Sequence, residues 1–318
     1  MANIYIFRRI LVSIVLVWVV LTLIFFMVHL LPGDALLSMA GDIPDQMTAE
    51  QRAEISHEMG LDRPLAVQYL DWIGKALHGD FGTSVSSRRP VIRDILVRVP
   101  RTAELAFSGL IVGLLIGIPL GVLSALYHNS FFDVAVNGVL TVVGTLPVYV
   151  TGIVLILIFG LKLGWVPTGG FVEITDNLGE HLRLLILPSF TLGTWIGAVA
   201  ARMTRTTMLE VLSEDYIRTA AAKGLPQKMI LFRHALRNAM IPVVTTIGLQ
   251  VGSLLGGAVL TEAVFTWPGI GSALVSAVAR RDYPVVQGAV VITVTAFIFT
   301  NLIVDIIISY LDPRVSYK

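Results

Sequence analysis

A short basic segment, SEDYIRTAAAKGLPQKMILFRHALRNAMIP at residues 213–242, interrupts an otherwise strongly apolar chain. It carries five Lys and Arg residues, and it lies between the apolar stretch 184–201 and the one that begins at residue 239. The chain of 318 residues is 55% hydrophobic and 14% charged, whereas soluble globular domains contain about 25% charged residues. The segment therefore predicts a polar loop between two helices that cross a membrane.

Six stretches of the chain have the length that a transmembrane helix needs, about 17–25 largely apolar residues. None of them contains Asp, Glu, Lys or Arg. They are residues 10–31, 105–127, 134–161, 184–201, 239–261 and 285–304. We therefore expect an all-α integral membrane protein with six transmembrane helices in a lipid bilayer. A cleaved signal peptide explains the first stretch less well, because its apolar run is longer than a signal h-region of about 7–15 residues.

Lys and Arg residues predict the orientation, because they are enriched in cytoplasmic loops. With the N-terminus inside, eleven of them fall on the cytoplasmic side and four in the short loops opposite. We therefore expect both termini in the cytoplasm and a large external loop, which is either a solvated cap or a platform for an external partner. The expected parts are 1–31 (N-terminus and first span), 32–101 (external loop), 102–310 (remaining spans, with the cytoplasmic loop 209–238) and 311–318 (cytoplasmic tail).

Glycines recur at every fourth residue in two of the expected spans. This spacing gives a helix a smooth stripe on which a second helix can approach closely. The stripe serves either as packing alone or as a sliding surface for helices that move during transport. The glycines are Gly109, Gly113, Gly117 and Gly121 in the second span and Gly248, Gly252 and Gly256 in the fifth. Four prolines are positioned to kink spans: Pro119, Pro147, Pro188 and Pro242.

Sequence motifs for chemistry are missing. The chain has no G-x-x-x-x-G-K-[ST], H-E-x-x-H or G-x-S-x-G pattern, no cysteine, and six histidines without metal-ligand spacing. We therefore expect no catalytic residue, no bound cofactor and no metal site. Polar groups within or at the edges of spans are candidates for a transport pathway, although a carboxylate such as Glu104 can equally satisfy a neighbour. The candidates are Thr145, Thr194, Gln250, Glu262 and Asp305.

Local signals within the opening segment delimit a short helix at 214–223. Ser213 is the expected N-cap, and two acidic residues follow it at the positive end of the helix dipole. Gly224 is the expected residue after the C-cap, and Pro226 prevents continuation. The run at 219–222, TAAA, has little side-chain bulk. We expect such a helix to gain little by burial in its own protein and to suit a groove on a partner protein. A basic helix on anionic lipid is the alternative.

The same segment resembles the coupling (EAA) loop of the membrane subunits of ABC importers. EDYIRTAAAKG followed by RHALRNAMIPVV is similar to the dipeptide/oligopeptide/nickel permease family. Four other motifs carry the resemblance over nearly the whole chain: HLLPGDA at 29–35, GLDRPLAVQYLDWIGKALHGDFGTS at 60–84, VFTWPGIG at 264–271 and RRDYPVVQG at 280–288.

The resemblance implies a type I ABC importer permease, a non-catalytic, multi-pass subunit of the bacterial inner membrane. It would form the translocation pathway for di- or oligopeptides with a second homologous permease and work by alternating access. Two cytoplasmic ATPase subunits would bind ATP and Mg²⁺, and an external substrate-binding protein would deliver cargo; no nucleic acid is involved. Nickel or other metal complexes and glutathione are alternative cargoes, and an ATP-independent secondary transporter is a more remote alternative.

The resemblance also implies which residues couple the permease to an ATPase. They are Glu214, Asp215, Tyr216, Arg218, Thr219, Ala220, Ala221, Lys223, Gly224 and Leu225. Gly224 matches the family pattern, whereas Arg218 replaces the Glu that gives the loop its name and Thr219 replaces its first Ala. Contacts specific to that Glu are therefore not expected here.

Overall fold

The computed structural model describes residues 2–30, 57 and 62–311. Every secondary-structure element assigned within these ranges is a helix. This confirms the all-α class. The chain divides into two compact units. Unit 1 comprises Met1–Ile6, Ala103–Trp267 and Thr300–Lys318, and unit 2 comprises Phe7–Thr102 and Pro268–Phe299. Most of the HLLPGDA motif (residues 31–35) and most of the first half of the expected external loop lie outside the described residues.

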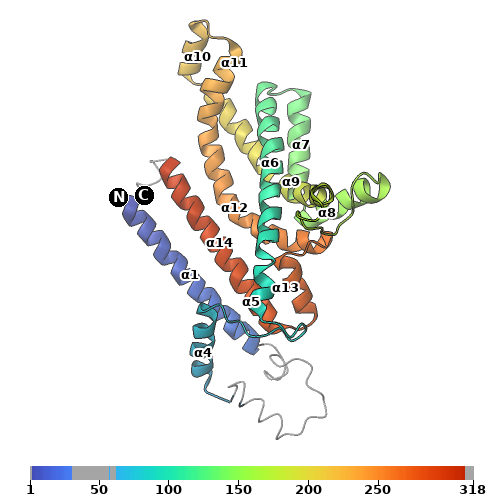
Figure 1. Ribbon diagram of the computed structural model, residues 1–318. Helices are drawn as coiled ribbons and strands as arrows, with labels where there is room; N and C mark the ends of the chain where they lie inside the picture. The colour runs from blue at the N-terminus through green and yellow to red at the C-terminus, as the bar shows by residue number, and fades with distance from the viewer. Residues whose placement is uncertain (1, 31–56, 58–61, 312–318) are drawn as a thin grey trace. The chain divides into compact units, whose positions relative to one another are not determined.

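Figure 1 shows the described helices in their order along the chain. They are α1 (Ala2–Leu30), α4 (Leu65–Leu77), α5 (Val91–Leu96), α6 (Val99–Leu126), α7 (Phe131–Thr145), α8 (Val148–Leu155), η1 (Ile156–Lys162, π-helical), α9 (Leu178–Leu212), α10 (Asp215–Ala222), α11 (Gln227–Met229), η2 (Ile230–Leu236, π-helical), α12 (Arg237–Phe265), α13 (Ile270–Ala279) and α14 (Tyr283–Leu311).

Five helical segments of the described chain are long and apolar enough to cross a membrane. They are Phe7–Met27, Val91–Leu126, Leu178–Leu212, Gln227–Phe265 and Tyr283–Ile307. Each contains most or all of one expected span, so five of the six predicted spans are single helical segments. The number rises to six when the bent pair formed by α7 with α8 and η1 is counted as one span.

The third expected span, 134–161, is not one helix. It is broken between α7 and α8, and the two parts are bent by 110°. Leu146 has an extended backbone (ψ 136°) and Pro147 is the N-cap of α8. The residue before a proline is driven out of the helical conformation by the proline ring, which explains the break. The other three prolines, at 119, 188 and 242, lie inside helices that continue past them.

Unit 1 is built around α9, which is buried along much of its length. The four glycines of the second expected span face it from α6: a Cβ on Gly109 would lie 2.6 Å from the Cβ of Leu192, and one on Gly117 would lie 2.9 Å from the Cα of Gly197. Gly113 and Gly121 likewise lie against α9. The two backbones therefore approach more closely than any larger residue on α6 would allow.

The glycines of the fifth expected span are less uniform. Gly252 is buried, and a Cβ there would meet the side chain of Asn301 on α14. Gly248 is half-buried, whereas a Cβ on Gly256 would have no other atom within 4 Å. These three positions therefore do not form one continuous stripe of close contact.

Unit 2 has a separate apolar core. Its buried residues come from α1, α4, the loop after α4, α5, α13 and α14, and include Leu21, Ala76, Val91, Ile270 and Ala289. In α14, a Cβ on Gly288 would lie 2.7 Å from the side chain of Val91, so this glycine permits the close approach of α5.

Candidate functional site

The helix α10 begins at a tight corner after α9. It spans Asp215–Ala222, one residue shorter at each end than expected, and its N-cap is Glu214 (φ −71°, ψ 146°). The expectation that Ser213 caps α10 is wrong: Ser213 is the C-cap of α9, and its hydroxyl donates to the carbonyl of Glu210 at 2.7 Å. Only two residues separate α9 from α10, so the polar groups of Ser213 are used to close the first helix.

The end of α10 is closed by a Schellman motif. The N–H of Gly224 donates to the carbonyl of Ala221 at 3.0 Å, and the N–H of Leu225 donates to that of Ala220 at 3.4 Å. Gly224 has φ +76°, in the left-handed region that residues with a Cβ rarely adopt. A Cβ there would have no neighbour within 4 Å, so the backbone conformation, not lack of space, requires glycine.

One side of α10 is anchored on its own unit. Ile217 and Ala220 are buried, and Ile217 belongs to a cluster with Val122 at the end of α6, Met208 on α9 and Ala239 on α12. The sequence suggested that α10 gains little by burial in its own protein, and Ile217 shows that this expectation is wrong. Anchoring fixes the direction in which the other side of α10 faces.

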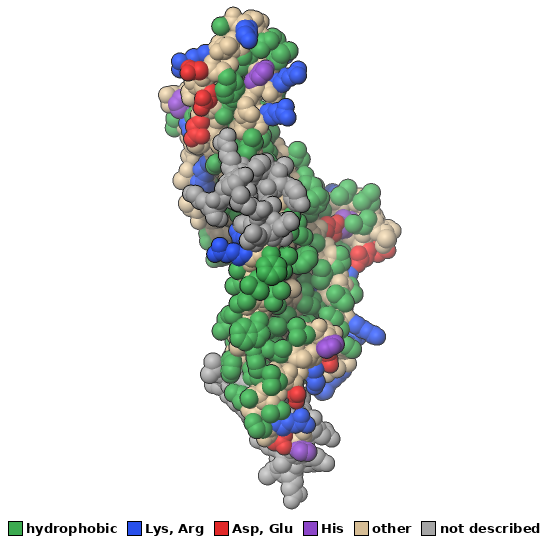
Figure 2. Space-filling view, turned by 90° about the vertical axis from the view of Figure 1, so that its left-hand side faces the viewer, with side chains coloured by type: hydrophobic (Ala, Val, Ile, Leu, Met, Phe, Trp, Pro, Cys, Tyr) green, Lys and Arg blue, Asp and Glu red, His purple; other side chains and the backbone are tan. Residues whose placement is uncertain are grey.

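The remaining side of α10 is exposed and combines small residues with charged ones. Arg218, Thr219, Ala221, Lys223 and Gly224 are all exposed, while Leu225 is half-buried. Asp215 and Arg218 form an exposed ion pair of 3.5 Å, and the Tyr216 hydroxyl accepts a hydrogen bond of 2.8 Å from Asn238. Figure 2 shows charged side chains gathered over α10 and α11 at the top of the view. The exposed side of α10 is therefore shaped for close contact with another surface.

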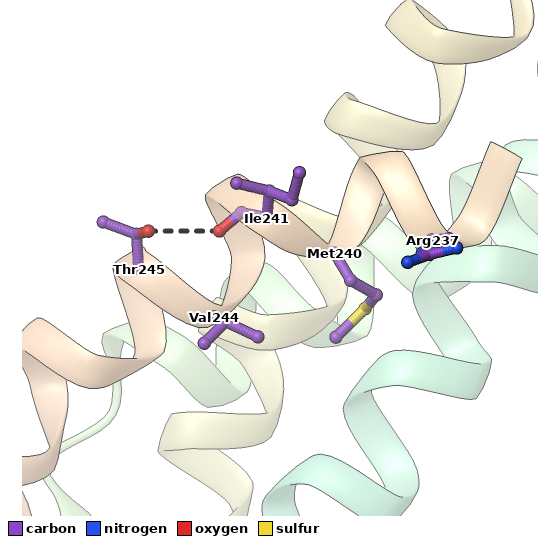
Figure 3. A pocket seen from close by; sticks show the side chains of 5 residues that line it. All are labelled: Arg237, Met240, Ile241, Val244 and Thr245. Atoms are coloured by element: carbon purple, nitrogen blue, oxygen red, sulfur yellow. Dashed lines mark hydrogen bonds between the residues drawn. The ribbon is translucent and has the colours of Figure 1, made fainter. Parts of the chain in front are cut away.

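A shallow, open hollow runs along α12, close to η2. It is lined by Arg237, Met240, Ile241, Val244 and Thr245, with a volume of about 150 Å³ (Figure 3). The Thr245 hydroxyl donates to the carbonyl of Ile241 at 3.1 Å, within the same helix. The hollow contains none of the expected pathway residues.

The expected pathway residues are spread over four helices. Thr145 on α7 and Thr194 on α9 each donate a hydroxyl hydrogen bond within their own helix, to the carbonyls of Thr141 and Thr191. Gln250 on α12 is half-buried, whereas Glu262 on α12 and Asp305 on α14 are buried. Their assignment to a pathway therefore stays a prediction.

Unit 1 contains a buried ion pair that the sequence did not predict. Both carboxylate oxygens of Asp133 on α7 accept hydrogen bonds of 2.7 Å from the guanidinium of Arg205 on α9. The side-chain amide of Asn137 donates to the same carboxylate at 2.7 Å. The hydroxyl of Ser124 on α6 also donates to it. The pair joins three helices. The only local signal is the capping pattern that begins at Ser130, whose hydroxyl accepts from the N–H of Asp133.

A second polar pair in unit 1 connects α6 to α9. Glu104 lies 2.7 Å from Nε2 of His181, which is buried. Nδ1 of His181 donates to the carbonyl of Val172 at 2.6 Å. The indole of Trp267 and the ring of Phe171 stand edge-on to the imidazole, at centroid distances of 5.6 and 5.7 Å. Of the two sequence-based explanations of Glu104, this contact supports the one in which it satisfies a neighbour.

Unit 2 holds a third polar cluster, formed by two of the motifs that carry the resemblance. The carboxylate of Asp282 accepts from the hydroxyl of Ser84 at 2.6 Å and from the N–H groups of Ser86 and Val85 at 3.0 and 3.2 Å. Burial of Asp282 opposes its ionisation, but these hydrogen bonds outweigh burial and hold its pKa below the ordinary value of 3.8. The carboxylate therefore holds the turn at residues 84–89 against the start of α14.

Comparison with protein families decides the class. Residues 117–317 match the model of the binding-protein-dependent transport system inner membrane component, and residues 3–106 match the model of the N-terminal part of such membrane components. The chain belongs to this permease family.

Curated relatives of the permease match over almost its full length. It is 42% identical over 316 residues to the di/tripeptide transport system permease protein DppB of Pseudomonas aeruginosa, covering 93% of this chain and 94% of that protein. It is 41% identical over 319 residues to the dipeptide transport system permease protein DppB of Escherichia coli, with the same coverage. The glutathione transport system permease protein GsiC of Salmonella typhimurium is 42% identical over 319 residues, covering 99% of both chains.

These relatives and the apolar helices establish the permease as a multi-pass protein of the inner membrane. The predicted family, fold class and localisation are thereby confirmed. Three of the four motifs that accompany the coupling segment lie wholly or largely within the described chain. Two of them meet at Asp282 in unit 2, while the third, at 264–271, contains the buried Trp267 and spans the boundary between the units.

Proposed function

We propose that this permease and a second homologous permease form the translocation pathway of an ABC importer for di- and oligopeptides. The observation that carries the proposal is the 41–42% identity, over 93% of the chain, to permeases named for dipeptide and di/tripeptide transport. The pathway would open alternately to the two sides of the membrane. The chain itself would be non-catalytic and would bind no cofactor.

The segment 214–225 would transmit the energy for transport. Because the sequence contains no phosphate-binding P-loop motif, two separate ATPase subunits would bind ATP and Mg²⁺ and drive the cycle. The helix α10 supports this assignment, because Ile217 anchors one side and the other side exposes small residues together with charged ones. We propose that this exposed side lies in a cleft of one ATPase, so that nucleotide-driven closure moves α10 together with the ends of α9 and α12.

An external substrate-binding protein would deliver the cargo and select much of it. The family description names a binding-protein-dependent system. A binding protein that holds the peptide first explains why the polar candidates of this chain need not form a tight binding site.

Glutathione is the second candidate cargo. The relative named for glutathione transport is 42% identical and covers 99% of this chain, so sequence identity does not separate it from the dipeptide relatives. Glutathione is itself a tripeptide with a γ-linked glutamate, and the same pathway can accommodate both cargoes by size.

Transport by the complete importer in proteoliposomes tests the proposal. The permease is co-purified with its partner subunits, and uptake of a radiolabelled dipeptide and of glutathione is measured in the presence of the binding protein. We expect dipeptide uptake that requires ATP and stops when the ATPase subunits carry an inactivated P-loop. Uptake driven by an ion gradient without ATP would contradict coupling to an ATPase. Uptake of glutathione but not of the dipeptide would show that glutathione is the cargo.

A further inference from the structure

The helix α4 in unit 2 has one side packed against α1 (Figure 1). The hydroxyl of Tyr69 forms a hydrogen bond of 2.7 Å with the hydroxyl of Thr22. The ring of Phe25 stands edge-on to that of Tyr69 at 5.4 Å and lies tilted to that of Trp72 at 5.9 Å. This packed side fixes both the position and the rotation of α4.

These contacts place α4 at the end of the first membrane span. The apolar segment of α1 covers Phe7–Met27, and its contacts with α4 lie at residues 22–26. At 1.5 Å per residue, these positions are within about 8 Å of the end of the segment. Aromatic residues such as Tyr69 and Trp72 are enriched at this level, where apolar chains meet the polar headgroups. The helix α4 is therefore at the depth of the membrane–water interface.

A second side of α4 exposes leucines. Leu70 and Leu77 are 67% and 70% exposed, and positions seven residues apart differ by only about 20° around a helix. Phe26 of α1 stacks on Tyr69, the residue before Leu70, at 6.2 Å. Phe26 is itself exposed, as are Leu23 and Met27, so α4 is packed on a part of α1 whose own surface is apolar and exposed.

Charged residues occupy a third side. Asp71 follows Leu70 by one residue and so lies about 100° away around the helix. Lys75, four residues after Asp71, shares its side. Both are exposed, and Asp71 forms an ion pair of 3.1 Å with Arg63. A helix with apolar and charged sides that point in different directions is typical of segments that lie in a bilayer interface.

We propose that α4 is an interfacial helix whose Leu70 and Leu77 insert into the lipid leaflet at that end of α1, while Asp71 and Lys75 face water. Lipid is favoured because the leucines are exposed on a helix that packs on the apolar, exposed end of a membrane span. Insertion removes their apolar side chains from water, which is favourable. The lipid contact would hold unit 2 at a defined height in the bilayer.

The absence of cysteine from the chain allows a direct test. Single cysteines are introduced as Leu70→Cys, Leu77→Cys and, as the matched control on the charged side, Lys75→Cys. Each is nitroxide-labelled in the permease co-purified with its partner subunits, in nanodiscs of phosphatidylethanolamine and phosphatidylglycerol. Electron paramagnetic resonance then measures collisions with oxygen, which concentrates in lipid, and with a water-soluble nickel chelate.

We expect the ratio of oxygen to nickel collisions to be several-fold higher at positions 70 and 77 than at position 75. A similar ratio at all three positions, with high nickel access, would show that the leucines face water and would overturn the proposal. Low access to both reagents at 70 and 77 would show that protein covers them and would also overturn it. All three side chains are exposed, so labelling removes no packed core contact.

Discussion

At the scale of single residues, the buried carboxylate of Asp133 is surrounded by several hydrogen-bond donors. Asp133 is 2% exposed, and its carboxylate accepts hydrogen bonds from Arg205, Asn137, Ser124 and the N–H of Asn129. A buried carboxylate without such partners would be strongly unfavourable. Burial of the Asp133 carboxylate therefore depends on the whole set of donors, and above all on the bidentate hydrogen bonds from Arg205.

Replacing Asp133→Ala should destabilise the permease by about 3 kcal/mol, because breaking a buried pair leaves the other charge uncompensated. The measurement is thermal unfolding of the co-purified importer in detergent, compared with the unchanged protein. The double variant Asp133→Leu, Arg205→Met is the control and should recover most of the loss, because it removes both charges. A single variant as stable as the parent would show that the pair contributes nothing.

Asp282 gives a pH-dependent prediction in unit 2. Its pKa in the folded protein is lower than the ordinary 3.8, so its contribution to stability is complete above that value and is lost as the pH falls through the folded pKa. Hydrogen exchange of residues 84–89, corrected for intrinsic rates, should therefore show constant protection between about pH 5 and 8 and a loss below about pH 4. The variant Asp282→Asn should lower protection across the whole range. Equal protection in the variant would contradict the role of the carboxylate.

At the scale of elements, two features depend on glycine for different reasons. Gly224 ends α10 because its backbone is left-handed, with open space around it. Gly117 lies in α6 because a backbone from α9 occupies the space of its side chain. The first glycine is needed for conformation and the second for packing, so the same substitution should act differently at the two positions.

Replacing Gly224→Val should strain the end of α10 by about 1–2 kcal/mol, the cost of a left-handed residue with a Cβ. If α10 couples the permease to an ATPase, the assembled importer should continue to hydrolyse ATP while peptide uptake falls. Gly224→Asn is the control, because Asn tolerates this conformation, and it should retain most of the uptake. Full uptake by Gly224→Val would contradict the coupling role.

Replacing Gly117→Ala should cost about 1–3 kcal/mol, the usual penalty for overpacking, because its Cβ would lie 2.9 Å from the Cα of Gly197. Gly138→Ala on α7 is the matched control, since a Cβ there has no neighbour within 4 Å. Thermal unfolding of the purified importer compares them. Equal unfolding temperatures would show that α6 and α9 separate without cost.

At the scale of the whole molecule, the sequence predicts the spans far better than the contacts between them. Runs of about 20 apolar residues are a local signal, which is why the class and the number of apolar stretches are evident from the sequence. The helix α10 is evident from another local signal, the glycine and proline that end it. The partners of Asp133 and Asp282 are 72 and 198 residues away, and no local pattern identifies them. The burial of Ile217 was missed for the same reason, because the side chains that cover it come from other helices.

The 110° bend between α7 and α8 allows two courses for this part of the chain: one broken span, or a loop that returns to the side from which it entered. Each membrane crossing takes the chain to the opposite side of the membrane. An even number of crossings therefore leaves both termini on the same side, and an odd number leaves them on opposite sides. Five crossings would place the termini in opposite compartments, whereas a sixth, made by the bent pair, would return the C-terminus to the side of the N-terminus. We expect fluorescent and phosphatase fusions to report the same cytoplasmic location for both ends. That result would mean that residues 131–162 cross the membrane once, as a broken span.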